Sequence, residues 1–119
     1  MAFKSIGAYV VVTVAGTPVR CSANQSDPAK RIVCHTLFIQ QHAGNTGKLY
    51  LCDRANATVS NGVGVLITIP APTLSNGVAV ILPWAAYTIP YAPGGGNVTD
   101  YYLDADNSGD KATVSIIVA

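Results

Sequence analysis

The chain has 119 residues, a length that suits one domain with a core of its own. Charged residues make up only 11% of it, against roughly 25% in typical soluble domains. The net charge is +1 and the basic residues are scattered, whereas a nucleic-acid-binding surface needs clustered lysines and arginines. No apolar run reaches the ~18 residues that a membrane helix needs. We therefore expect a single domain, residues 1–119, that binds neither nucleic acid nor membrane.

The chain begins with a predicted β-strand over residues 3–14, which are rich in Val, Ile, Tyr and Thr. This apolar run is too short and too β-branched for a secretory leader, and Gly7 within it is typical of a β-bulge. Residues 22–31 form a polar loop. Strands are then expected at 32–41 and 48–53, joined by turn residues 42–47 into a hairpin.

The phrase Ser-Asn-Gly-Val occurs twice, at residues 60–63 and 75–78, and each copy leads into an apolar stretch. Asn-Gly favours positive φ at successive positions, so both copies predict tight turns before the strands 63–69 and 78–82. Pro70 and Pro83 mark the ends of these strands. A further strand is expected within 84–91, and 101–104 with 113–118 predicts a C-terminal hairpin.

No segment carries a convincing helical period, while short strands recur between turn signals along the whole chain. This spacing is typical of antiparallel all-β domains. We predict an all-β fold, either a single antiparallel β-sandwich or a jelly-roll-like barrel. Its N-terminal strand, within residues 1–16, is a candidate for subunit contacts.

Cysteine and histidine give no pattern of an active site. The three cysteines lack CxxC spacing and their odd number argues against a disulfide framework, so free buried thiols are expected, with a Cys34–Cys52 bridge left open. Cys34 and His35 are adjacent on a predicted strand and would point to opposite faces, which prevents a catalytic dyad. We expect no catalytic residue, no enzyme activity and no cofactor.

The turn at 104–110 resembles the start of a calcium-binding loop, with Asp104, Asp106 and Asp110 as candidate ligands of a weak cation site. The twelfth position, where such loops place a bidentate Glu, is Ser115 inside a predicted strand. A plain turn without a bound metal is therefore the favoured interpretation, and the cation site is the alternative.

Aromatic residues crowd the last third of the chain, where Trp84, Tyr87, Tyr91 and Tyr101 could pack in the core, form a protein interface or stack on sugars. Open sheets usually protect their edges with charges, and this chain has few. Coverage by neighbouring subunits would satisfy those edges, so we expect a homo-oligomer, a dimer or trimer. The candidate contact residues are Phe3, Tyr9, Val11, Trp84, Tyr87, Tyr91, Val114 and Ile116.

Several strand and turn phrases occur in a recognisable order. They are Leu37-Phe38-Ile39-Gln40, Gly44-Asn45-Thr46-Gly47-Lys48-Leu49-Tyr50-Leu51-Cys52-Asp53, Ser60-Asn61-Gly62-Val63, and Thr99-Asp100-Tyr101-Tyr102-Leu103-Asp104 before Gly109-Asp110. The order resembles small β-rich virion proteins of tailed bacteriophages, of the capsid decoration (cement) or head-fibre type. Cys52 stands where that family's phrase has Gly.

The resemblance implies a structural protein that binds major capsid subunits and stabilises the shell at the virion surface, after assembly in the host cytoplasm. Strand addition to a neighbouring sheet would suit such a role, and residues 3–14 and 112–119 are the candidate strands. Two alternatives remain open. One is a tail or baseplate subunit, and the other is a carbohydrate-binding or adhesin module that uses the aromatic residues.

Overall fold

The computed structural model describes residues 3–90 and 96–118, and its strands are all paired antiparallel. This confirms the predicted all-β class. The elements are β1 (Phe3–Val11), β2 (Val19–Arg20), β3 (Val33–Gln41), β4 (Leu49–Cys52), η1 (Val59–Asn61), β5 (Val65–Ile69), β6 (Thr73–Ser75), β7 (Val78–Ile81), β8 (Trp84–Thr88), β9 (Gly96–Asn97), η2 (Val98–Asp100), β10 (Tyr102–Ala105) and β11 (Lys111–Val118).

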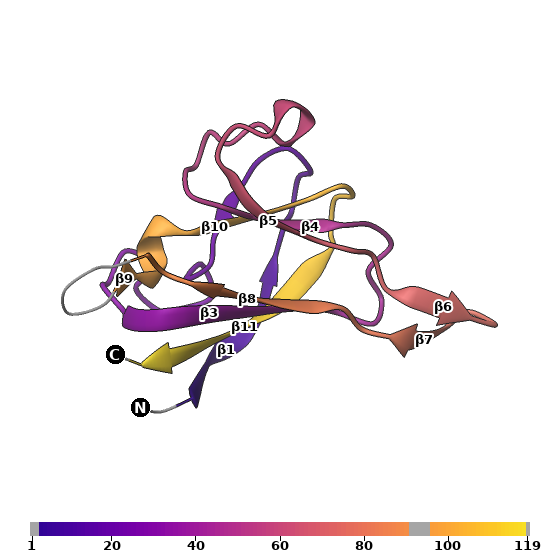
Figure 1. Cartoon of the computed structure of the whole chain (residues 1–119), viewed down its shortest axis with the longest axis horizontal. Helices are drawn as coiled ribbons and strands as arrows, with labels where there is room; N and C mark the ends of the chain where they lie inside the picture. Colours follow the sequence, from indigo (N-terminus) through magenta and orange to yellow (C-terminus); the bar gives the residue numbers. More distant parts are fainter. Residues whose placement is uncertain (1–2, 91–95, 119) are drawn as a thin grey trace.

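The main strands pair in a nested way: β1 with β11, β2 with β10, β3 with β8, and β4 with β5. Lateral pairing then joins them into sheet A, in the order β1-β11-β3-β8, and sheet B, in the order β2-β10-β4-β5. The short β9 also pairs with β3. This nested hairpin rolled into two facing sheets is the jelly-roll arrangement, one of the two predicted forms (Figure 1). We call the two sheets the body.

The molecule is not a single sandwich, because β6 and β7 form a separate two-stranded sheet. In Figure 1 this ribbon projects from the end of the body opposite the two chain termini. It is inserted between β5 of sheet B and β8 of sheet A.

Two predicted hairpins are wrong. β3 and β4 lie in opposite sheets, and so do β10 and β11, so neither pair is hydrogen-bonded as a hairpin. The turns at 42–47 and 106–110 instead carry the chain across the edge of the body from one sheet to the other. Each of these turns therefore joins strands that face each other across the core instead of strands that pair edge to edge. Turn residues such as Gly and Asn are typical of both kinds of connection, so the sequence did not distinguish a hairpin from a crossing between sheets.

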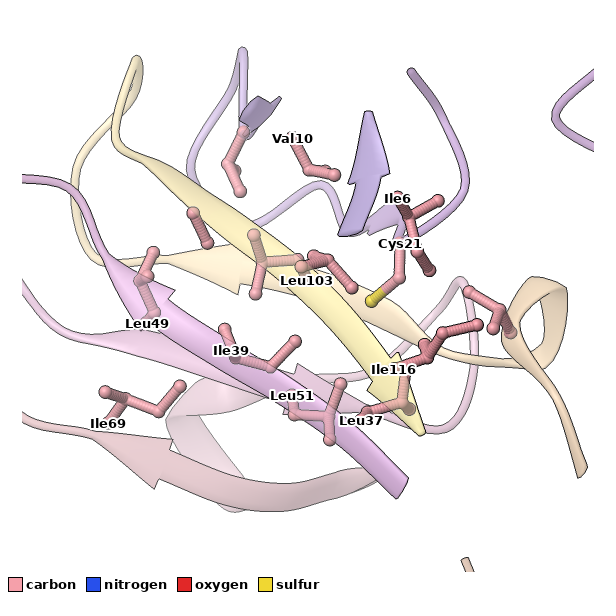
Figure 2. Packing of buried hydrophobic residues seen from close by; sticks show 14 of the residues in the cluster. Ile6, Val10, Cys21, Leu37, Ile39, Leu49, Leu51, Ile69, Leu103 and Ile116 are labelled. Carbon is pink, nitrogen blue, oxygen red and sulfur yellow. The ribbon is translucent and has the colours of Figure 1, made fainter. Parts of the chain in front are cut away.

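The core lies between the two sheets and is filled by the inward-facing aliphatic side chains of both (Figure 2). Burial of each such side chain stabilises the fold by about 1.5–3 kcal/mol. The fully buried large residues are Val10, Val12, Leu37, Ile39, Leu49, Leu51, Ile69, Val98, Leu103, Val114 and Ile116.

Register shifts occur in four of the strand pairs, and two of them bear on the sequence predictions. The register between β1 and β11 shifts between Ser5 and Tyr9, which confirms the bulge predicted at Gly7. The register between β11 and β3 shifts next to Cys34, whose side chain is buried while that of His35 is exposed. Among the residues that the structure describes, no helix is long and apolar enough to cross a membrane.

Candidate interaction surface

The projecting ribbon, residues 73–82, is the most distinctive surface feature, and we call it the arm. Ser75 pairs with Val78 across a two-residue loop in which Asn76 has φ 52° and Gly77 has φ 77°. Two successive positive φ values define the hairpin turn that Asn-Gly favours, so the turn predicted here is confirmed. The arm is therefore a tight, locally specified hairpin.

Gln41, at the end of β3, holds both ends of the arm. Its side-chain Nε2 donates a hydrogen bond to the carbonyl of Pro70 at 3.0 Å, and its backbone N–H donates to the carbonyl of Pro83 at 3.0 Å. The side chain is buried, and its Oε1 accepts a hydrogen bond from Asn45 Nδ2. The two strands thus leave the body from a fixed base, which gives the arm a defined direction.

The arm exposes apolar side chains on both of its faces. Pairing of Thr73 with Ile81 and of Ser75 with Val78 places Ile81 and Val78 on one face, and Leu74 lies on the opposite face. These three residues and Val80, in the adjoining bulge, are 53% to 65% exposed. No Asp, Glu, Lys, Arg or His occurs between Arg54 and Asp100, so the arm is also uncharged.

A second apolar feature lies beside the base of the arm. Trp84, the first residue of β8, is 61% exposed, and its ring lies 6.1 Å from that of Phe38 on the neighbouring strand β3. Together with Gln40, Thr113 and Ser115, these rings line a shallow cavity of about 280 Å³ on the outer face of sheet A. We call these five residues the Trp84 groove. Its lining contains no charged side chain.

The far side of the same face belongs to β1. Tyr9 and Val11 are exposed there, and the Tyr9 ring packs edge-on against His42 at 4.6 Å and beneath Lys111 Nζ at 5.0 Å. Within the described residues β1 pairs only with β11, so its other edge carries no strand. Of the predicted contact residues, Tyr9, Val11 and Trp84 are thus accessible to another molecule.

Other predicted contact residues occupy different environments. Val114 and Ile116 are buried in the core, and β11 lies between β1 and β3 with both edges already paired. The C-terminal strand therefore cannot add to a neighbouring sheet, and this prediction is wrong. It failed because an apolar, β-branched strand has the same sequence pattern at the centre of a sheet as at its edge.

The predicted aromatic platform is not assembled. Tyr87 is half-buried against the core, with its ring 5.8 Å from that of Tyr101, whereas Trp84 lies on the outer face of sheet A. Tyr91 and the side chain of Phe3 lie outside the described residues. The Trp84 ring therefore lies beside the Phe38 ring and does not form a common surface with the tyrosines.

The candidate cation ligands are occupied with structural hydrogen bonds. Buried Asp104 accepts from the backbone N–H groups of Gly16 and Ala105 through Oδ1, while its buried Oδ2 has no hydrogen-bond partner. Asp106 accepts from the Tyr50 hydroxyl at 2.6 Å.

Asp110 accepts from the backbone N–H groups of Thr46 and Gly47, and so ties the two connecting turns together. Over residues 3–90 and 96–118 no three acidic, His or Cys side chains converge as metal ligands. The geometry of this turn is that of a structural element.

The thiols are free and buried, as expected from their number and spacing. Burial raises the pKa of Cys34 to about 11. Burial, followed by the charges of Asp104 and Asp53, raises the pKa of Cys52 to about 12. Since the thiolate is the reactive form, both are inert at neutral pH.

Comparisons with protein-family models, with curated proteins and with solved structures each gave no significant match. Function must therefore be inferred from the surface itself.

The arm and Phe38 were missed as contact candidates in the sequence. A usable signal was present, because residues 78–82 read Val-Ala-Val-Ile-Leu and do not alternate with polar residues, although Pro83 marks them as lying at a strand end. An unalternating apolar strand with both faces buried normally belongs to a central sheet. In the arm the same pattern instead leaves these side chains exposed, because no second sheet covers the hairpin in the described part of the chain.

Proposed function

We propose that this protein is a non-enzymatic structural subunit of a virion, which decorates and stabilises a phage capsid by binding its major capsid subunits. The observation that carries the proposal is the exposed, uncharged apolar surface formed by the arm and the outer face of sheet A. Monomeric soluble proteins rarely expose contiguous apolar patches above a few hundred Å², and larger ones mark interaction sites. The order of the strand and turn phrases, which resembles that of small phage virion proteins, is the second ground for the proposal.

The edge of β1 is the best candidate for the contact with the capsid. No second strand pairs with this edge in the described part of the chain, although Asn24 Nδ2 donates a hydrogen bond to the Ile6 carbonyl at 2.8 Å, and Tyr9 and Val11 present exposed side chains near the end of the strand. An unpaired edge can accept a strand from a neighbour, with main-chain hydrogen bonds for affinity and side chains for specificity. Such a contact requires no catalytic group.

Co-sedimentation with expanded empty shells of the major capsid protein from the same virus tests this role. We expect the wild-type protein to sediment with the shells and the Tyr9→Asp/Val11→Asp variant to remain in the supernatant. Val14→Asp is the matched control, because Val14 is equally exposed but lies in the loop after β1. Failure of the wild-type protein to bind such shells would contradict the proposal.

A carbohydrate-binding role is the second candidate, favoured by one observation. The Trp84 groove combines an exposed indole and a phenyl ring with the polar side chains of Gln40, Thr113 and Ser115, a combination suited to stacking and hydrogen bonding with a sugar. Trp84 is the single tryptophan, so its fluorescence reports this site alone. Saturable quenching by a glycan in dilute solution would favour this role over assembly.

A further inference from the structure

The arm is incompletely covered in the folded chain. It projects away from the body in Figure 1, and its apolar side chains point to both sides of the ribbon. A two-stranded hairpin alone is at best marginally stable in water. The anchoring of both ends by Gln41 fixes where the arm emerges but covers none of its exposed residues. A second molecule is needed to cover them.

The exposed area matches what a stable dimer requires. From the exposed fractions of their residues, the arm and the Trp84 groove together present on the order of 800 Å², which is the area that each partner contributes to a standard interface. This surface has an aromatic and aliphatic centre and no charge, as the buried centre of a protein interface does.

The arm and the groove also complement each other. Both are apolar and uncharged, so neither buries an unpaired charge when they meet. The arm does not cover the groove of its own chain, because Trp84 remains 61% exposed. The groove of another copy is therefore free to receive it.

We propose that the arm of one chain docks in the Trp84 groove of a second copy, and that the second arm returns the contact to form a two-fold dimer. Leu82, Pro83 and Trp84 are consecutive, so donor and acceptor surfaces lie side by side. A two-fold axis near this point brings each arm onto the groove of the partner, with residue i contacting j and j contacting i. The groove is complete only when the partner's arm fills it.

This inference deepens the proposed assembly role by naming the self-association surface, but it is tested without a capsid. Capsid binding is assigned to β1, and dimerisation to the arm and the Trp84 groove. Tyr9 lines a hollow with Leu82, Gln40 and Thr113 beside the groove, whereas Val11 does not line it, so Val11→Asp alone should lose capsid binding and keep the dimer mass. Loss of one is therefore distinguishable from loss of the other.

Size-exclusion chromatography with light scattering measures the association directly. We expect the wild-type chain to have twice the 12.3 kDa mass of one chain. Val80→Asp in the arm and Trp84→Ala in the groove should each raise the dissociation constant by roughly a hundredfold, because one buries an unpaired charge and the other removes the central ring. Val14→Asp introduces the same charge at an equally exposed valine outside the interface and should leave the mass unchanged.

Mixing the two defective chains separates loss of contact from misfolding. The Trp84→Ala chain retains its arm and the Val80→Asp chain retains its groove. Their 1:1 heterodimer carries both substitutions in one contact and none in the other, whereas each variant's homodimer carries one substitution in both contacts. Because one substitution is enough to break a contact, the heterodimer should associate more tightly than either homodimer. Different affinity tags on the two chains allow this heterodimer to be captured and weighed.

A wild-type chain that remains monomeric up to about 1 mM, the weak limit of measurable association, would overturn the proposal. So would a dimer that Val80→Asp and Val14→Asp affect equally, or a mixture of the two defective chains that associates no more tightly than either chain alone.

Discussion

The sequence Ser-Asn-Gly-Val occurs in the body and in the arm, and it folds differently in the two places. In the body Asn61 ends the 3-10 helix η1, and Gly62 caps this helix with φ 75°. In the arm Asn76 and Gly77 both have positive φ and form the two-residue loop of a hairpin. The same four residues thus specify a reversal of the chain but not its geometry.

The difference lies in what surrounds each copy. Val59, just before the first copy, packs with Tyr50, Cys52 and Ala57 in a small apolar cluster beside the main core. This contact holds the preceding residues in a helical turn. Nothing of this kind holds the second copy, so the intrinsic preference of Asn-Gly decides its conformation. Tertiary packing thus determines the conformation of the copy in the body. The local preference of Asn-Gly determines the turn in the arm, and Gln41 determines where the arm leaves the body.

The largest expected difference between the body and the arm is in the stability lost when a leucine is shortened to alanine in each. Leu103→Ala, at the centre of the body, should lower the free energy of unfolding by about 2–5 kcal/mol, because it removes fully buried methyl groups and leaves a cavity. Leu74→Ala in the arm should lower it by less than about 0.5 kcal/mol in dilute solution. Urea unfolding of both variants measures this, and equal losses would show that the arm is part of the same cooperative unit.

High pH should destabilise the body through its thiols. The pKa of Cys34 rises from 9.0 to about 11 on folding, so the unfolded chain ionises first and stability falls as pH increases between these values. The loss should reach about 2 kcal/mol per such thiol by pH 11. Cys34→Ala should show a smaller fall over this range in urea titrations, and parallel curves would exclude this thiol as the source. The arm has no titratable side chain and contributes nothing to the fall.

Replacement of Gln41 tests the junction between the two regions. Gln41→Leu keeps the volume but leaves the carbonyls of Gly47 and Pro70 without its Nε2, so stability should fall by about 1–3 kcal/mol. Gln40→Leu is the matched control, since Gln40 is exposed on the other face of β3, and should change stability by less than about 0.5 kcal/mol. Hydrogen exchange of the arm amides should accelerate only in Gln41→Leu.

The smallest effect compares the two glycines of the repeated phrase. Gly62 and Gly77 have φ values of 75° and 77°, and an added Cβ would meet no atom within 4 Å at either position. Alanine therefore strains only the backbone, at a cost of about 1–2 kcal/mol. We expect Gly62→Ala to lower global stability by this amount, whereas Gly77→Ala should speed amide exchange in the arm without moving the urea midpoint. A lowered midpoint in both variants would contradict the separation of the two regions.

The sequence was informative where chemistry is local. The Asn76-Gly77 turn, the strand ends before Pro70 and Pro83, the bulge at Gly7 and the free cysteines followed from residue type and spacing. The partners of each strand did not, because a strand such as β11 reads the same in a hairpin, at an edge or in the centre of a sheet. Exposure of Val78 and Val80 was hidden for a similar reason, since valine is equally typical of buried strands.

Nested pairing also sets the order in which the chain can fold. β1 precedes all other described strands in the chain, yet its only described partner is β11, which follows all of them. Folding must close a loop over nearly the whole chain, which is typical of domains that fold in milliseconds to seconds. The arm needs only ten neighbouring residues and can form within microseconds of its synthesis. The arm that makes the proposed contact is therefore formed before the groove that receives it, because the groove needs Thr113 and Ser115 of β11. Self-association must wait until the body has folded, and this order keeps newly made chains apart while they are incomplete.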